Sequence, residues 1–227
     1  ASSNGASIGF LDVTNPLDPI ITPINTSVTG TLTAIAAVGN GGIYLNQTSG
    51  VLRIGEINAG TGDVRITAAD NLTTTAGVDV IGTDITLSLA PNQLLTVDAG
   101  TSITAASDVT LISDKMELLS SGTDSIKATE TLLIRASAIG TAIRLGSAAG
   151  VDSDAGSGTL ALTDLEVAAL NDTSGLIQFG AAGSRGATTI ASGGTTLTIN
   201  APLAFVVTSL GFASAGDALA TDSTFVI

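Results

Sequence analysis

Short pieces in which one polar residue stands between two apolar residues recur from Ile43 to Leu145. Gly, Asn, Asp, Ser and Thr separate these pieces. Successive side chains of a β-strand point to opposite faces, so each piece places two apolar groups on one face and one polar group on the other. The stretch therefore predicts many short strands, each with one buried face. The clearest pieces are Leu52-Arg53-Ile54, Val64-Arg65-Ile66, Val78-Asp79-Val80, Ile85-Thr86-Leu87, Val109-Thr110-Leu111, Met116-Glu117-Leu118 and Ile143-Arg144-Leu145.

The spacing of these pieces predicts how the strands are connected. Val64, Ile85, Val109 and Leu132 begin four similar pieces, separated by 21, 24 and 23 residues, with further apolar pieces between them. A repeat of this length cannot bury its own apolar face and must stack on its neighbours. We therefore predict an all-β fold, a parallel β-helix (β-solenoid) with coils of about 21–24 residues. Roughly ten coils about 4.8 Å apart would give a rod on the order of 50 Å long.

The composition indicates what fills the rod. Hydrophobic residues make up 44% of the chain, but aromatic residues only 3%. The interior must therefore be built from aliphatic side chains, which suits a narrow core stacked in layers. We predict that ten residues from the clearest pieces point into it: Leu52, Ile54, Val64, Ile66, Ile85, Leu87, Val109, Leu111, Ile143 and Leu145.

We divide the chain into an arm (residues 1–26), a solenoid shaft (27–200) and a terminal coil, cap or assembly segment (201–227). The arm holds Pro16, Pro19 and Pro23, and proline cannot donate to a sheet ladder. It either folds over its own end or flank, or adds as a strand to a neighbouring subunit. The last segment contains most of the few Phe residues, which would either cap the final coil or contact a further one.

One short segment departs from the strand rhythm. Thr163 followed by Glu166 fits a capping box, so residues 163–170 could begin a helix of one or two turns. The preceding residues, Leu160 to Leu162, have the pattern of a strand. Both interpretations of the segment stay open at this point.

Several classes of function are disfavoured by composition. The formal net charge is −13, and the seven basic residues are scattered singly, which disfavours nucleic acid and anionic membranes as partners. Uninterrupted apolar runs reach only five residues, so membrane insertion is not expected. The chain has no His and no Cys, which removes Ser-His-Asp and Cys-His catalysis and disfavours a structural zinc site. We expect no catalysis and no cofactor other than a calcium ion.

Asp152 and Asp154 are the candidate calcium ligands. They stand two residues apart in a loop-like segment, and calcium binds oxygen ligands of this kind. The same acids could instead be solvated loop residues, or the paired acids of a sugar hydrolase or lyase built on a β-helix.

Four segments carry a resemblance to a known family. Residues 41–45 (GGIYL), 62–68 (GDVRITA), 83–87 (TDITL) and 107–111 (SDVTL) resemble the repeats of filamentous-haemagglutinin-type adhesins. The resemblance covers roughly residues 40–145. It implies a right-handed β-helical shaft from a large secreted bacterial protein, located outside the cell or at its surface.

The resemblance leads to a structural or adhesive shaft as the expected function. The expected partners are copies of the chain, neighbouring domains of the same large protein, or surface glycans. Two alternatives stay open: a self-assembling extracellular filament subunit joined head-to-tail through the N-terminal arm, and a carbohydrate-active β-helix enzyme or glycan-binding module.

Overall fold

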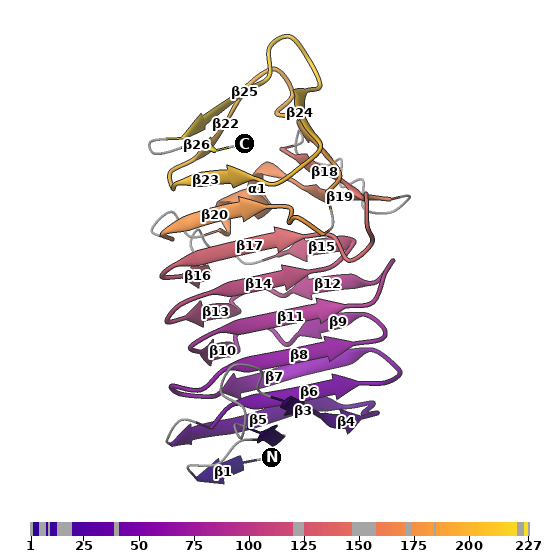
Figure 1. Ribbon diagram of the computed structural model, residues 1–227, viewed down its shortest axis with the longest axis vertical. Coiled ribbons are helices and arrows are strands. Elements are labelled where there is room, and N and C mark those ends of the chain that lie inside the picture. The colour runs from indigo at the N-terminus through magenta and orange to yellow at the C-terminus, as the bar shows by residue number, and fades with distance from the viewer. Residues whose placement is uncertain are drawn as a thin grey trace.

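The computed structural model describes residues 2–4, 8, 10–12, 20–38, 41–119, 125–146, 158–170, 174–183, 185–221 and 225–226. The chain forms a stack of short parallel strands with one short helix among the described residues (Figure 1). In Figure 1 it runs to the right across the front, returns behind and rises with each turn, so the coils are right-handed. The predicted parallel β-solenoid is confirmed.

The coils have three faces, which we number in chain order. Face 1 is a nine-stranded parallel sheet of β4 (Ile24–Thr26), β6 (Ile43–Gln47), β8 (Val64–Ala68), β11 (Ile85–Leu89), β14 (Val109–Ile112), β17 (Thr131–Arg135), β20 (Leu176–Phe179), β23 (Leu203–Phe205) and β26 (Phe225–Val226). In the first coils β5 (Thr31–Val38) and β7 (Leu52–Asn58) are long strands that cross both other faces. Above β7, face 2 holds β9 (Leu72–Thr74), β12 (Leu94–Val97) and β15 (Lys115–Leu118), and face 3 holds β10 (Asp79–Gly82), β13 (Ser102–Ala105) and β16 (Ile126–Ala128).

The upper coils are built from two further sheets. A four-stranded sheet contains β18 (Ala142–Leu145), β19 (Thr159–Leu162), β21 (Ala187–Ile190) and β24 (Ser209–Phe212). A two-stranded sheet contains β22 (Thr196–Ile199) and β25 (Ala218–Thr221). The helix α1 (Asp164–Ala168) directly follows β19 in the chain and contacts β15, β19 and β22.

The predicted register of the regular coils is confirmed. Val64 pairs with Ile85, Ile85 with Val109, and Val109 with Leu132, so the 21-, 24- and 23-residue spacings are the coil lengths. All ten predicted core residues are buried, at 2% exposure or less. In each of these coils the apolar residues face the interior because the strand period of two matches their spacing.

The stack is shorter than the expected ten coils. Among the described residues face 1 holds nine strands, or about eight turns of chain, which at about 4.8 Å per step span roughly 38 Å. Leu132 pairs with Ile177, 45 residues later, so this one step consumes about two coil lengths. The extra residues form β18, β19 and α1, which lie on the other faces.

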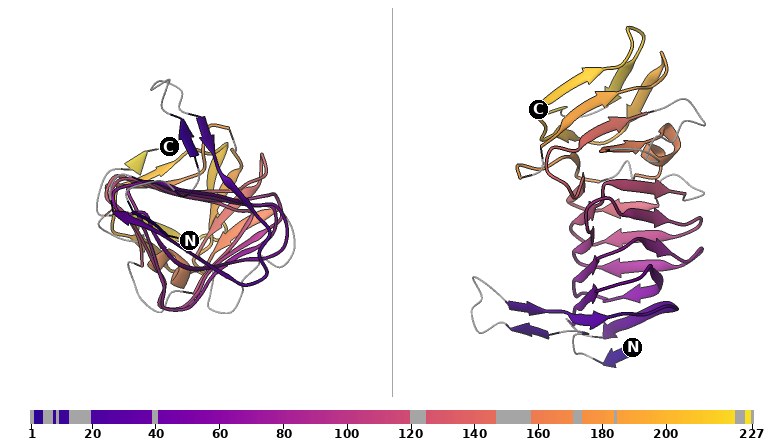
Figure 2. Two further views of the ribbon diagram at one scale, coloured as in Figure 1. Left: turned by 90° about the horizontal axis from the view of Figure 1, so that it is seen from below. Right: turned by 90° about the vertical axis from the view of Figure 1, so that its right-hand side faces the viewer.

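The arm covers the first coil in part and leaves it in part. β1 (Ser2–Asn4) pairs with β5, Ile8 forms a bridge with Ile43, and β4 pairs with β6. Between them β2 (Phe10–Asp12) and β3 (Ile20–Thr22) form an antiparallel pair that projects sideways from the stack (Figure 2). Pro23 separates β3 from β4, whereas Pro16 and Pro19 lie outside the described residues.

The Phe residues near the C-terminal end do not form a single cluster. Phe179 and Phe205 are buried inside the solenoid and stack on each other with ring centroids 5.6 Å apart. Together they form an aromatic layer that continues the stacked aliphatic core. Phe212 is 54% exposed, and the side chain of Phe225 lies outside the described residues.

Residues 163–170, for which the sequence left helix and strand open, begin as a helix. Thr163 is the N-cap of α1, its side chain accepts from the Glu166 amide, and the Glu166 side chain accepts from the Thr163 amide. The capping box is therefore formed. In the part of the chain that the structure describes, no helix has the length and apolar character to cross a membrane.

Candidate functional site

Three aspartates form a column along the corner before face 1. Asp63, Asp84 and Asp108 directly precede the paired residues Val64, Ile85 and Val109, so they occupy the same position in successive coils. Each carboxylate accepts from the backbone N–H one coil above: Asp63 from Asp84 at 3.4 Å, Asp84 from Asp108 at 3.2 Å, and Asp108 from Thr131 at 2.8 Å. The column therefore satisfies corner amides that the strand ladder does not reach.

The aspartate column also places like charges close to one another. Partial burial and then the charge of Asp84 raise the pKa of Asp63, while the hydrogen bond from the Asp84 amide opposes this rise. Within the described residues no group of three acids or other metal ligands is arranged to hold a metal ion. The carboxylates of the column join each coil to the next through backbone amides, and their position could have been read from the sequence once the coils were aligned.

Two buried acids were not singled out correctly from the sequence. Asp114 is 4% exposed and bridges two neighbouring coils, accepting from the Asn92 amide at 2.7 Å and the Ala138 amide at 2.8 Å. Glu166, which the sequence indicates only as part of the capping box, is 6% exposed. Its carboxylate also accepts from the Leu118 amide, a contact inside the fold that the capping box does not predict.

The predicted calcium ligands Asp152 and Asp154 lie outside the described residues. Calcium binding there stays a prediction, and so does the alternative in which these acids serve a carbohydrate-active site.

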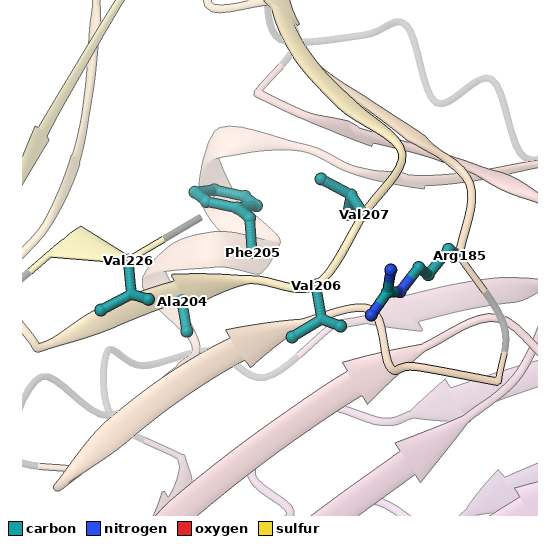
Figure 3. Close-up of a pocket in the computed structure, with 6 residues that line it drawn as sticks. All are labelled: Arg185, Ala204, Phe205, Val206, Val207 and Val226. Atoms are coloured by element: carbon teal, nitrogen blue, oxygen red, sulfur yellow. The ribbon is translucent and has the colours of Figure 1, made fainter.

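An open hollow near the C-terminal end is the candidate binding site. It has a volume of about 490 Å³ and is lined by Arg185, Ala204, Phe205, Val206, Val207 and Val226. Figure 3 shows the Arg185 side chain beside Val206 at one end and Val226 at the other. β23 and β26 supply two of the walls, and the loop that leads to β21 supplies the arginine.

The chemistry of this hollow is limited. Its lining offers mainly aliphatic surface with one guanidinium, since the Phe205 ring is buried, and this combination fits an apolar group carrying an anionic or polar end. The lining residues include neither a carboxylate nor a nucleophile. The sequence had no signal for this site, since Arg185 meets residues 204–207 only through the stacking of coils.

Comparison with known proteins gives no match for the chain. No family model, no curated protein and no solved structure matches the chain.

Proposed function

We propose that the chain is a structural or adhesive shaft of a secreted bacterial surface protein, works outside the cell or at its surface, and does not catalyse a reaction. The observation that carries the proposal is the nine-stranded parallel sheet of face 1, which runs through the whole stack. Its seven interior strands are each hydrogen-bonded on both sides, so a load applied along the stack passes from one ladder to the next.

The side chains on the outer surface fit this role. At one outward position on face 1, Arg65, Thr86 and Thr110 are polar in three successive coils, and Leu133 follows them in the next. The acids that lie at the corners are committed to backbone amides, as described for Asp63 and Asp114. A surface of this kind separates and presents other domains, or offers lateral contacts to glycans.

The proposal is tested on cells of the source organism. Antibodies raised against the purified chain should label intact cells, and removing the coding segment should shorten the surface structure seen by electron microscopy. Labelling only after the cells are lysed would contradict the proposed location. A glycan array with the purified chain then separates an adhesive shaft from a purely structural one.

A filament subunit is the second candidate. The antiparallel pair of β2 and β3 projects from the first coil, and in a filament it would contact a neighbouring molecule (Figure 2). In this arrangement deletion of residues 1–26 abolishes fibres in negative-stain electron microscopy. A monomeric mass at all concentrations would exclude this candidate.

A further inference from the structure

The four-stranded sheet continues face 2 above β15, and its strands do not follow the order of the chain. β18 pairs with β19 on one side, through Ile143 and Leu160, and with β21 on the other, through Ile143 and Thr188. β19 in turn lies against β15 (Figure 1). The order along the stack is therefore β15, β19, β18, β21, although β18 precedes β19 in the sequence.

Residues 158–170 are held from below. The Leu118 amide at the end of β15 donates to Glu166 Oε1 at 3.0 Å. The Ile126 amide of β16 donates to the Ala169 carbonyl at 3.0 Å, and Ile126 forms a parallel bridge with Leu170. This segment therefore closes a coil directly on top of β15 and β16.

The same residues are held from above by an earlier part of the chain. The Ala142 amide donates to the Gly158 carbonyl at 3.3 Å, and the Gly146 amide donates to the Leu162 carbonyl at 2.8 Å. These bonds lie at the two ends of β18, so the strand covers β19 along its whole length.

From this order we infer that β18 is a strap that locks residues 158–170 into the stack and stops the solenoid from unwinding from its C-terminal end. In a regular coil the last segment of the chain is also the outermost strand, so it detaches without disturbing the strands beneath. β19 is not outermost. When the chain is pulled from the C-terminal side of β19, the hydrogen bonds between β19 and β18 and the contacts between β19 and β15 must break together. The lock follows from the strand order alone, and only its use in bearing load rests on the proposed function.

Disulfide trapping tests the strand order. Arg144 and Thr189 are paired neighbours on β18 and β21 and are both partly exposed. Paired residues of adjacent strands lie about 5 Å apart, within reach of a disulfide. In the full chain, which contains no native Cys, the double variant Arg144→Cys with Thr189→Cys should form a crosslink on mild oxidation.

The matched control is Ala161→Cys with Thr189→Cys. β18 separates these two positions, so their Cα atoms lie about two strand steps apart, roughly 9–10 Å, beyond the reach of a disulfide. The expected result, read by thiol counting on folded protein, is a crosslink in the first pair only. A crosslink in the control pair, or none in the first pair, would overturn the strap.

Force spectroscopy tests the locking itself. The full chain is held at its C-terminus and at Thr86→Cys on β11, so that the coils below are not loaded. Unwinding should release the roughly 57 residues after Leu170, about 200 Å of chain, and then pause. Continuous release through residues 158–170 without a pause would refute the lock, and it would leave the proposed surface function untouched.

Discussion

The backbone amide of Leu118 donates to Glu166 Oε1 across 48 residues of sequence, at 3.0 Å in the buried interior. Leu118 ends the last regular strand of face 2, and Glu166 lies in the only helix among the described residues. The bond therefore joins the regular coils to the irregular ones above them.

We expect Glu166→Gln to destabilise the chain by about 2 kcal/mol. The buried carboxylate accepts from Leu118 and Thr163, and glutamine replaces one of its two acceptor oxygens by a donor. Chemical denaturation measures the change in the free energy of unfolding. Glu117→Gln, on the outward side of β15, is the control and should change it by less than about 0.5 kcal/mol. Equal effects of the two variants would contradict the role of Glu166.

Gly186→Ala should destabilise the chain by more than about 2 kcal/mol. A Cβ atom at this position would overlap the Thr141 carbonyl oxygen just before β18, so one backbone must move. Gly183 lies three residues earlier, and a Cβ there meets nothing within 4 Å. Gly183→Ala should therefore leave the melting temperature unchanged or raise it slightly. If Gly186→Ala melts like the wild type, the close approach of these backbones is wrong.

Phe205→Ala should cost about 3–5 kcal/mol in the free energy of unfolding. The ring is 2% exposed and stacks on Phe179 with an interplanar angle of 21°, so its removal leaves a cavity and one unstacked ring. Phe212→Ala is the control, because Phe212 is 54% exposed, and a change within about 0.5 kcal/mol is expected. Urea unfolding followed by circular dichroism distinguishes the two.

Thr188→Val should stabilise the chain by about 1 kcal/mol. Thr188 faces the interior at 1% exposure, and among the described residues its hydroxyl oxygen has no hydrogen-bond partner. Valine has nearly the same shape and does not carry the cost of burying an unpaired hydroxyl. Differential scanning calorimetry measures the gain. A lower melting temperature would mean that the hydroxyl is satisfied in solution.

Asp63→Asn should raise stability at pH 7 but not near pH 3. Burial and the charge of Asp84 raise the pKa of Asp63 in the folded state, so the folded protein holds this proton more tightly than the unfolded chain does. The resulting stabilisation is complete below the unfolded pKa of 3.8 and is lost as the pH rises through the folded pKa. Asparagine carries no charge at pH 7, so the variant should gain about 0.5 kcal/mol in the free energy of unfolding there, the size expected for a partly exposed group.

Asp217 is the control of opposite sign for this experiment. Hydrogen bonds from the Gly194 amide and then from Ser214 and Ser192 lower the pKa of Asp217, so its contribution is present at neutral pH and lost in acid. Asp217→Asn should lower the melting temperature at pH 7. Melting curves of both variants between pH 3 and pH 7 give the comparison, and parallel curves for the two would contradict both assignments.

The regular coils were predictable because their determinants are local. The two-residue alternation of Val64-Arg65-Ile66 specifies the buried face, and the spacing to Ile85 and Val109 specifies the register. The capping box of Thr163 and Glu166 is also a local pattern, and it formed as such. The hollow beside Arg185 was not predictable, since its walls come from segments about 20 and 40 residues apart.

By itself the sequence determined the strand rhythm, the coil length and the aliphatic core, because each of these depends on residues that are neighbours along the chain or one repeat apart. Only the tertiary structure decided that β19 lies beneath β18. Residues 142–145 and 159–162 have the same alternation of apolar positions, so either could occupy the place above β15. The choice rests on contacts such as Leu118 with Glu166, which exist only after the coils have stacked.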